Sequence, residues 1–284
     1  MKIIFLGQNG FLIESKNSTI IVDPYLSDSV EKIEPLNKRK QPIDDSFLHI
    51  KPNAIVITHA HADHYDEETL DKILGGKASD ESGEDKNCMF LSPPSVFFKA
   101  KARYPWCNHV IFRNGTSVTI GDITFRAVKA EHSDAEAIGV IISAENKKLY
   151  ITGDTLYSET VFESVFDAVE SLPEKEIPEK EIPKKEISKK EIREKEIPEK
   201  EIREKEIPEK KIDVLFLPVN GRGNNMNAGD AGRFAARLNP DFVVPVHFGM
   251  FDDLRGAEVS EELKTAFKKG KIIIPEIYKE IKIK

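Results

Sequence analysis

Three short apolar runs open the chain, and turn-forming residues separate them. The runs read KIIFL, FLIES and TIIVD, with Gly7 to Gly10 and Lys16 to Ser18 between them. Runs of this length, rich in β-branched and aromatic residues and bounded by glycine and polar clusters, are typical of β-strands. We therefore expect a β meander at the start of the chain, and a further hairpin around Gly121 and Asp122.

Four later apolar runs end abruptly in residues that carry polar or metal-binding groups. They are Ala54 to Ile57 before His59, Leu149 to Ile151 before Asp154, Asp213 to Leu217 before Asn220, and Val243 to Val246 before His247. Buried strands that deliver polar side chains at their C-terminal ends are how α/β proteins assemble a site at one edge of a sheet. These runs therefore predict a shared functional edge.

Apolar residues at helical spacing lie between the predicted strands. Ser158 caps a helix with an apolar face from Val161 to Leu172, a shorter helix begins near Asp66 and ends before Gly75, and another spans Ala228 to Leu238. Two facing mixed β-sheets with outer helices would bring the polar strand ends together, so we expect an α/β fold of this kind, a four-layer αββα sandwich. A single doubly wound sheet is the alternative, and the early meander fits it poorly.

A five-residue repeat of the type EKEIP fills residues 173–211. Five residues advance an α-helix by about 140° and turn a strand to its other face, so the repeated isoleucines form no stripe in either structure. Five prolines also interrupt helix continuity there. We interpret the repeat as a low-complexity surface insertion in a single domain over residues 1–284, and a partner-binding or oligomerising arm is the alternative.

Charge and cysteine content narrow the class of function. The chain has 42 Lys and Arg against 49 Asp and Glu, and this balance disfavours an extended nucleic-acid-binding surface. Cys88 and Cys107 form neither a metal-type pair nor a disulfide framework, so we expect reduced thiols. The first residues lack a signal-peptide pattern, and no run reaches the roughly 18 apolar residues of a membrane helix. We therefore expect a cytoplasmic protein without membrane contact, while homo-oligomerisation stays open.

The segment THAHADHYD concentrates metal-binding residue types after an apolar run and before a predicted helix. It contains His59, His61, Asp63 and His64. Imidazole and carboxylate are ligands of borderline divalent metals, and such crowding suits two ions close together. A lone histidine is usually solvated or hydrogen-bonded, whereas four such groups at this spacing indicate a metal centre. Because the candidate ligands are nitrogen and oxygen atoms without cysteine, Zn²⁺ and Mn²⁺ are both candidates.

This segment resembles the His-x-His-x-Asp-His motif of the metallo-β-lactamase fold superfamily. The superfamily's remaining positions are matched in order by Asp23 in IIVDPYLSD, His132 in AEHSD, Asp154 in ITGDT and His247 in VPVHFG. The stretch FLPVNGRGNNMNAGDAGRFAARLNPDFVVPVHFGMFDD further resembles the L-ascorbate 6-phosphate lactonase-like branch. The resemblance covers most of residues 1–34, 54–74, 87–172 and 212–255.

The resemblance implies the roles of these residues. One metal ion would be held by His59, His61 and His132, the other by Asp63, His64 and His247, with Asp154 between them and Asp23 in support. Paired cations lower the pKa of a shared water and stabilise oxyanion charge, so the nucleophile is water. Asp63 could also act as a base, although a carboxylate at this position is more often a ligand. The branch favours Mn²⁺ over Zn²⁺.

Amide and guanidinium groups follow a predicted strand in the glycine-rich loop NGRGNNMN. Asn220, Arg222 and Asn227 are candidates to hold a phosphate or a developing oxyanion, and the alternative is a loop stabilised by its own hydrogen bonds. We therefore predict a metal-dependent hydrolase that acts on an ester, lactone or phosphoester of a small, anionic metabolite. The alternatives are a phosphodiesterase or nuclease-like hydrolase and a metal-binding scaffold without turnover.

Overall fold

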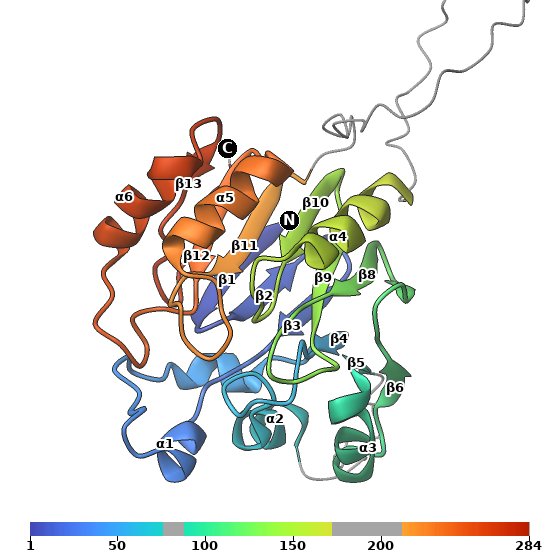
Figure 1. Ribbon diagram of the computed structural model, residues 1–284. Coiled ribbons are helices and arrows are strands. Elements are labelled where there is room, and N and C mark those ends of the chain that lie inside the picture. Colours follow the sequence, from blue (N-terminus) through green and yellow to red (C-terminus); the bar gives the residue numbers. More distant parts are fainter. Residues whose placement is uncertain (76–87, 172–211, 284) are drawn as a thin grey trace, which may run out of the picture.

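Two β-sheets face each other, and helices cover the outer face of each sheet (Figure 1). The computed structural model describes residues 1–75, 88–171 and 212–283. The pentad repeat at 173–211 lies outside the described residues, so its interpretation as a surface insertion stays a prediction. The four-layer αββα sandwich predicted from the sequence is confirmed, because each sheet mixes parallel and antiparallel pairs and neither is doubly wound.

The first sheet has the strand order β1-β2-β3-β4-β5-β6. Its strands are β1 (Lys2–Gly7), β2 (Gly10–Glu14), β3 (Thr19–Val22), β4 (Ala54–Val56), β5 (Met89–Ser92) and β6 (Asn108–Ile111). The predicted meander forms the antiparallel part, β1 to β3, and the strands from β3 to β6 are parallel. The carboxyl ends of β3 and β4 therefore lie at the same edge.

The second sheet has the strand order β13-β12-β11-β10-β9-β8-β7. Its strands are β7 (Ser117–Ile120), β8 (Ile123–Lys129), β9 (Ile138–Ala144), β10 (Lys147–Ile151), β11 (Val214–Pro218), β12 (Phe242–Val246) and β13 (Lys271–Ile272). The expected hairpin joins β7 to β8 through Gly121 and Asp122. Strands β10, β11 and β12 run parallel, so their carboxyl ends also meet at one edge.

Helices flank both sheets. They are α1 (Ser29–Ile33), the 3₁₀ turn η1 (Asp45–His49), α2 (Glu67–Leu74), α3 (Pro94–Arg103), α4 (Glu159–Ser171), α5 (Ala228–Leu238) and α6 (Gly256–Ala266). The three helices predicted from periodicity correspond to α2, α4 and α5. Asp66 caps α2 by accepting the Glu68 N–H, and the Ser158 hydroxyl accepts the Val161 N–H at the start of α4.

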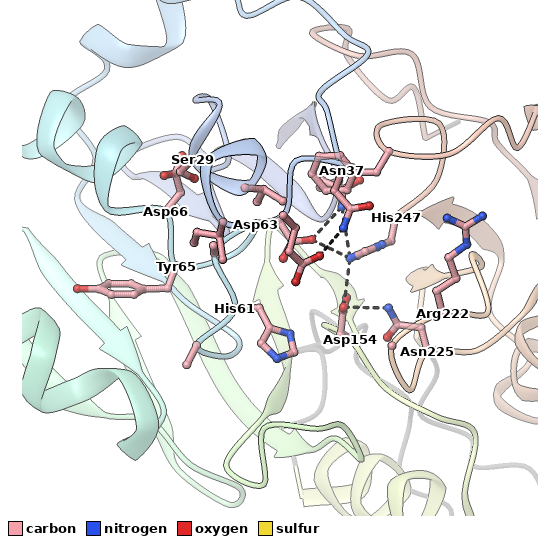
Figure 2. Close-up of a pocket in the computed structure, with 18 of the residues that line it drawn as sticks. Ser29, Asn37, His61, Asp63, Tyr65, Asp66, Asp154, Arg222, Asn225 and His247 are labelled. Atoms are coloured by element: carbon pink, nitrogen blue, oxygen red, sulfur yellow. Dashed lines mark hydrogen bonds and ion pairs between the residues drawn. The ribbon is translucent and has the colours of Figure 1, made fainter.

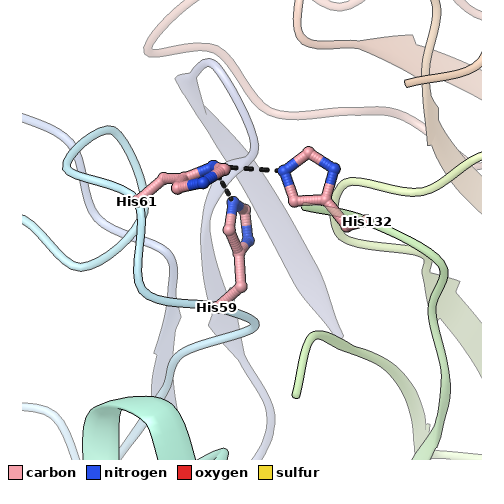
Figure 3. A group of neighbouring side chains, drawn as sticks. All are labelled: His59, His61 and His132. Atoms are coloured by element: carbon pink, nitrogen blue, oxygen red, sulfur yellow. Dashed lines mark hydrogen bonds between the residues drawn. The ribbon is translucent and has the colours of Figure 1, made fainter. Parts of the chain in front are cut away.

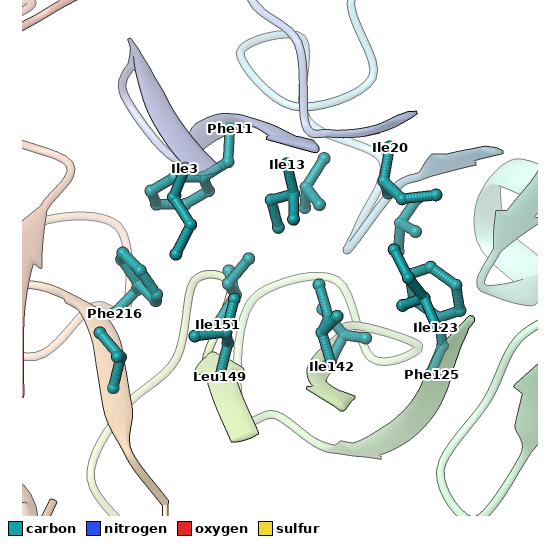
Figure 4. Packing of buried hydrophobic residues seen from close by; sticks show 14 of the residues in the cluster. Ile3, Phe11, Ile13, Ile20, Ile123, Phe125, Ile142, Leu149, Ile151 and Phe216 are labelled. Carbon is teal, nitrogen blue, oxygen red and sulfur yellow. The ribbon is translucent and has the colours of Figure 1, made fainter. Parts of the chain in front are cut away.

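The main core lies between the two sheets and is built from the inward-facing residues of both (Figure 4). Phe11 from β2 and Phe216 from β11 meet edge to face across it, with ring centroids 4.7 Å apart. A second cluster packs α4, α5 and α6 on the outer face of the second sheet, and a third packs α2 and α3 on the first. The sandwich thereby holds the strand ends of both sheets in fixed positions.

Across the described ranges, every helix is too short or too polar to span a lipid bilayer.

Candidate metal centre

The functional edge predicted from the sequence forms where parallel strands of both sheets end. Asp23 follows β3, the segment from Thr58 to His64 follows β4, Asp154 follows β10 and His247 follows β12. His132 comes from the loop between β8 and β9. All seven predicted metal ligands fall into groups whose potential ligand atoms lie within 4.8 Å of one another. Residues far apart in the sequence are therefore brought to one place.

His59, His61 and His132 form one of these groups (Figure 3). The Nδ1 atom of His61 lies 3.0 Å from His59 Nε2 and 3.1 Å from His132 Nε2. Three imidazoles converge on one point although two of the rings come from a different loop than the third. The Ser133 hydroxyl lies 3.3 Å from His61 Nε2, on the other side of that ring.

Asp63, His64 and His247 form a second group. Asp63 Oδ2 lies 3.2 Å from His247 Nε2 and 3.7 Å from His64 Nε2. His64 is completely buried, whereas the Asp63 carboxylate retains some contact with solvent. Figure 2 shows the Asp63 carboxylate and the His247 ring in direct contact at the cavity.

Asp154 lies between the two groups. Its Oδ2 atom is 3.1 Å from His247 Nε2, 3.8 Å from His132 Nε2 and 4.0 Å from His59 Nε2. Its Oδ1 atom is 3.4 Å from His64 Nε2. This single buried carboxylate therefore reaches members of both groups, which is the geometry that a bridging ligand requires.

Asp23 supports the cluster through hydrogen bonds to Thr58 and His64. It is fully buried in a left-handed conformation with φ 41°, and it accepts hydrogen bonds from the Thr58 N–H and hydroxyl at 2.8 and 2.6 Å. Its Oδ2 atom also lies 2.8 Å from His64 Nδ1. Because a carboxylate only accepts, Nδ1 of His64 carries a hydrogen, and Nε2, which faces Asp154, is the ring nitrogen left to bind a metal ion.

A second carboxylate, Asp134, joins the loop of the histidine motif to the loop of His132. Its Oδ2 atom accepts the Ala60 N–H at 3.0 Å and the Ser95 hydroxyl at 2.7 Å. Asp134 lies two residues after His132, so these contacts tie the two loops together. They hold the backbone of the motif and leave the imidazole rings free to face the cavity.

The electrostatics of the cluster favour positive charge at its centre. Burial alone would lower the pKa of His64, but the nearby carboxylates, Asp154 first among them, raise it well above its ordinary value. Burial also lowers the pKa of His247, but Asp154 and Asp63 outweigh that effect and raise it to about 10. His59 lies beside fewer carboxylates, and burial followed by repulsion from His64 lowers its pKa well below the ordinary value.

Two buried atoms at the centre fit a metal ion better than a hydrogen-bond network. His64 Nε2 and Asp154 Oδ1 have no hydrogen-bond partner among the described residues, although they lie 3.4 Å apart. Leaving such atoms unsatisfied costs about 1–3 kcal/mol each, and a divalent cation would satisfy both. The donor set of imidazole nitrogens and carboxylate oxygens, without cysteine, suits Zn²⁺ or Mn²⁺.

The three residues predicted in the loop after β11 have different surroundings. Asn220 Nδ2 lies 2.9 Å from His247 Nδ1, so this amide contacts a candidate ligand. Arg222 is exposed and lines the cavity. Asn227 caps α5 by accepting the Asp230 N–H at 2.8 Å, which supports the interpretation of this residue as part of a self-stabilised loop.

Two further amides contact the cluster and were not singled out in the sequence. Asn225 Nδ2 donates to Asp154 Oδ2 at 2.9 Å, and Gln8 Nε2 donates to Asp63 Oδ2 at 2.9 Å. Asn225 lies within the polar loop already noted, where its neighbours have the same composition. Gln8 lies in an early turn, and its sequence gives no sign that this turn faces the site. Only the folded structure shows that these two amides, and not their neighbours, contact the carboxylates.

The fold and the site place this protein among the metallo-β-lactamase fold proteins. Residues 2–157 match the family model described as the beta-lactamase superfamily domain, and they include the histidine motif, His132 and Asp154. The match covers more than half of the chain. The chain therefore belongs to the beta-lactamase superfamily.

Curated relatives include a UPF0173 protein of Pyrococcus furiosus, 22% identical over 271 residues that cover 93% of this chain and 91% of the relative. A UPF0173 metal-dependent hydrolase of Ruegeria is 30% identical over 173 residues, which cover 55% of this chain and 64% of the relative. A solved metallo hydrolase from the archaeon Ignicoccus hospitalis has a TM-score of 0.65 at 17% identity, covering 99% of this chain and 97% of that one. An identity this low supports a shared fold alone.

Proposed function

We propose that this protein is a metal-dependent hydrolase with two divalent cations, which acts on an ester, lactone or phosphoester of a small, anionic metabolite. The observation that carries the proposal is the position of Asp154, whose two oxygens reach both groups of candidate ligands. The name of the Ruegeria relative, a metal-dependent hydrolase, supports hydrolysis. The lactonase-like resemblance, the preference for Mn²⁺ over Zn²⁺ and the cytoplasmic location stay parts of this proposal.

The candidate ligands divide between two sites. His59, His61 and His132 would hold one cation, Asp63, His64 and His247 the other, and Asp154 would contact both. When bound, such a pair of cations lowers the pKa of a water molecule and offsets negative charge that develops on the substrate. Asp23 and Asn220 hold the rings of His64 and His247 in place, and Asn225 holds the carboxylate of Asp154.

The cavity above the cluster supports a small, anionic substrate. Its volume of about 830 Å³ lies within the usual range for small-molecule sites. Among the described residues that line it, Lys32 and Lys99 form ion pairs with Glu68 and Glu67, whereas Arg222 forms none. Arg222 is therefore the lining cation that is available to an anionic group of the substrate. Asn220 stays a candidate for the oxyanion, with its contact to His247 as a competing role.

Replacing Asp154 tests the dinuclear proposal. We expect Asp154→Ala to lose metal loading and hydrolysis together, because the variant lacks the one carboxylate that reaches both groups. The measurement is metal content per chain by mass spectrometry, followed by activity on a panel of lactones, phosphodiesters and thioesters. Asp122→Ala is the matched control, since this exposed carboxylate accepts hydrogen bonds from Ser15 and Ser18 and does not line the cavity. An Asp154→Ala chain with two ions and normal turnover would refute the assignment.

A further inference from the structure

The turn between β1 and β2 carries an unusual residue. Gln8 is only 2% exposed and has φ 50°, in the left-handed region that costs about 1–2 kcal/mol for a residue with a side chain. Gly7 before it has φ 97°, and a Cβ there would lie 2.6 Å from the Met250 side chain. Packing therefore confines the turn. Strain of this kind persists where the surrounding structure imposes it, and such places are often functional.

Gln8 contacts the cluster through both its side chain and its backbone. Its Nε2 atom donates to Asp63 Oδ2 at 2.9 Å and lies 3.4 Å from His247 Nε2. Its carbonyl oxygen accepts the N–H of His247 at 2.8 Å. His247 is itself left-handed, with φ 59°, so both partners in this contact hold a strained backbone. One residue of the first sheet thereby holds two members of the Asp63, His64 and His247 group.

The chemistry of the amide suits this position. A carboxylate oxygen has two lone pairs, so Asp63 Oδ2 can accept the Gln8 N–H and still bind a cation. A neutral donor leaves the charge of Asp63 intact, whereas a lysine or arginine would cancel it. Asn225 makes the corresponding contact with Asp154 Oδ2. Each of the two carboxylates of the cluster is therefore oriented by an uncharged amide.

We propose that Gln8 is a positioning residue for one of the two metal sites, an inference that rests on the proposed function. Its N–H holds Asp63 in the orientation needed for a cation shared with His64 and His247. Its recorded contacts include Asp63 and His247 but none of His59, His61 and His132 within the described ranges. Loss of the amide should therefore weaken one site and leave the other unchanged.

Two substitutions separate this role from a structural role in the turn. Gln8→Leu removes the amide and keeps a side chain of similar size in the same strained backbone. Gln8→Gly removes the amide and also relieves the strain, because glycine adopts positive φ without steric cost. Gln41→Leu is the matched control. Gln41 is the chain's other glutamine, and its amide donates to the Gly249 carbonyl in the loop that follows His247, at 3.3 Å.

The measurement is metal affinity by competition with a chromophoric chelator, with Zn²⁺ and Mn²⁺ as probes, together with thermal unfolding of the metal-free chains. We expect Gln8→Leu and Gln8→Gly to bind one ion as the wild type does and the other about 10–100-fold more weakly. The metal-free Gln8→Gly chain should unfold at or above the wild-type temperature. Gln41→Leu should bind both ions normally. Unchanged affinity for both ions in the two Gln8 variants would overturn the proposal.

Gln8→Glu tests whether residue 8 positions Asp63 or contacts the metal itself. As an acceptor facing Asp63 Oδ2, glutamate should weaken the same site at least as much as leucine does. Tighter binding would mean that residue 8 contacts the metal directly, and would overturn a positioning role. The wild type tests the proposed function separately. If the wild type bound a single ion, the dinuclear site would be refuted. The Gln8 inference would then stand only if Gln8→Leu weakened the binding of that ion. A wild type without metal would overturn both.

Discussion

His64, His247 and His109 lie in contrasting surroundings, and the pKa values of their rings shift in opposite directions. His64 and His247 lie among carboxylates, which raise the pKa of each ring against the effect of burial. His109 packs beside the rings of Phe90 and Phe97, and burial lowers its pKa. Its Nε2–H donates to the Tyr104 carbonyl at 2.8 Å, and its Nδ1 is buried without a partner among the described residues.

This environment predicts a pH dependence of stability. The pKa of folded His109 is below its unfolded value of about 6.5, so the unfolded chain binds more protons as the pH falls. The contribution is therefore present above about pH 6.5 and is lost as the pH falls toward the folded pKa. We expect His109→Gln, which can still donate to Tyr104, to lose less stability than the wild type between about pH 7.5 and about pH 5 in urea unfolding. An identical loss in both proteins would contradict this assignment.

At the scale of the element, local signals place helix ends accurately. Helix α5 begins after Asn227, whose side chain accepts the Asp230 N–H, and ends at Asn239, which has φ 51°. Both boundaries agree with the range Ala228 to Leu238 predicted from apolar residues at helical spacing. Its buried face includes Gly232, where a Cβ would lie 2.9 Å from the Leu263 carbonyl of α6. That close approach between helices depends on tertiary packing, and periodicity alone does not predict it.

The cap of α5 also separates two interpretations of the loop after β11. We expect Asn227→Ala to lower the free energy of unfolding by about 1 kcal/mol, because the Asp230 N–H loses its acceptor. Asn227→Ser should retain most of that stability, since a serine hydroxyl also caps helices well. Both variants should bind metal and turn over substrate normally. A large rise in KM without loss of stability would instead place Asn227 in contact with the substrate.

At the scale of the whole molecule, the two sheets form a continuous core that positions every candidate ligand. The described strands and helices pack against one another on both faces of each sheet. A five-residue period presents no consistent apolar face to such a core. We therefore keep the prediction that the repeat at 173–211 is an insertion in a single domain.

Deletion tests that prediction. Replacing residues 174–210 by a short flexible linker should preserve folding, metal content and hydrolysis, because none of the candidate ligands lies in the removed segment. Circular dichroism, metal analysis and the substrate panel measure the three properties on the deleted and full chains. Loss of all three would show that the repeat is part of the folded domain. Loss of an oligomer alone, seen by light scattering, would favour the oligomerising arm.

The sequence by itself determined the opening meander, the hairpin at Gly121, the four strands that end at the site and the three periodic helices. With the resemblance that it carries, it also indicated the superfamily and the seven candidate ligands. These are readable because apolar runs, helix caps and the His-x-His-x-Asp-His spacing are local patterns. The resemblance already implied that Asp154 lies between the two ligand groups. Only the tertiary structure decided that Asn220 contacts His247 and that Gln8 contacts Asp63. Those contacts join residues from different strands of two sheets, and their distances depend on how the sheets pack. A turn glutamine looks the same in sequence whether it faces solvent or a metal centre.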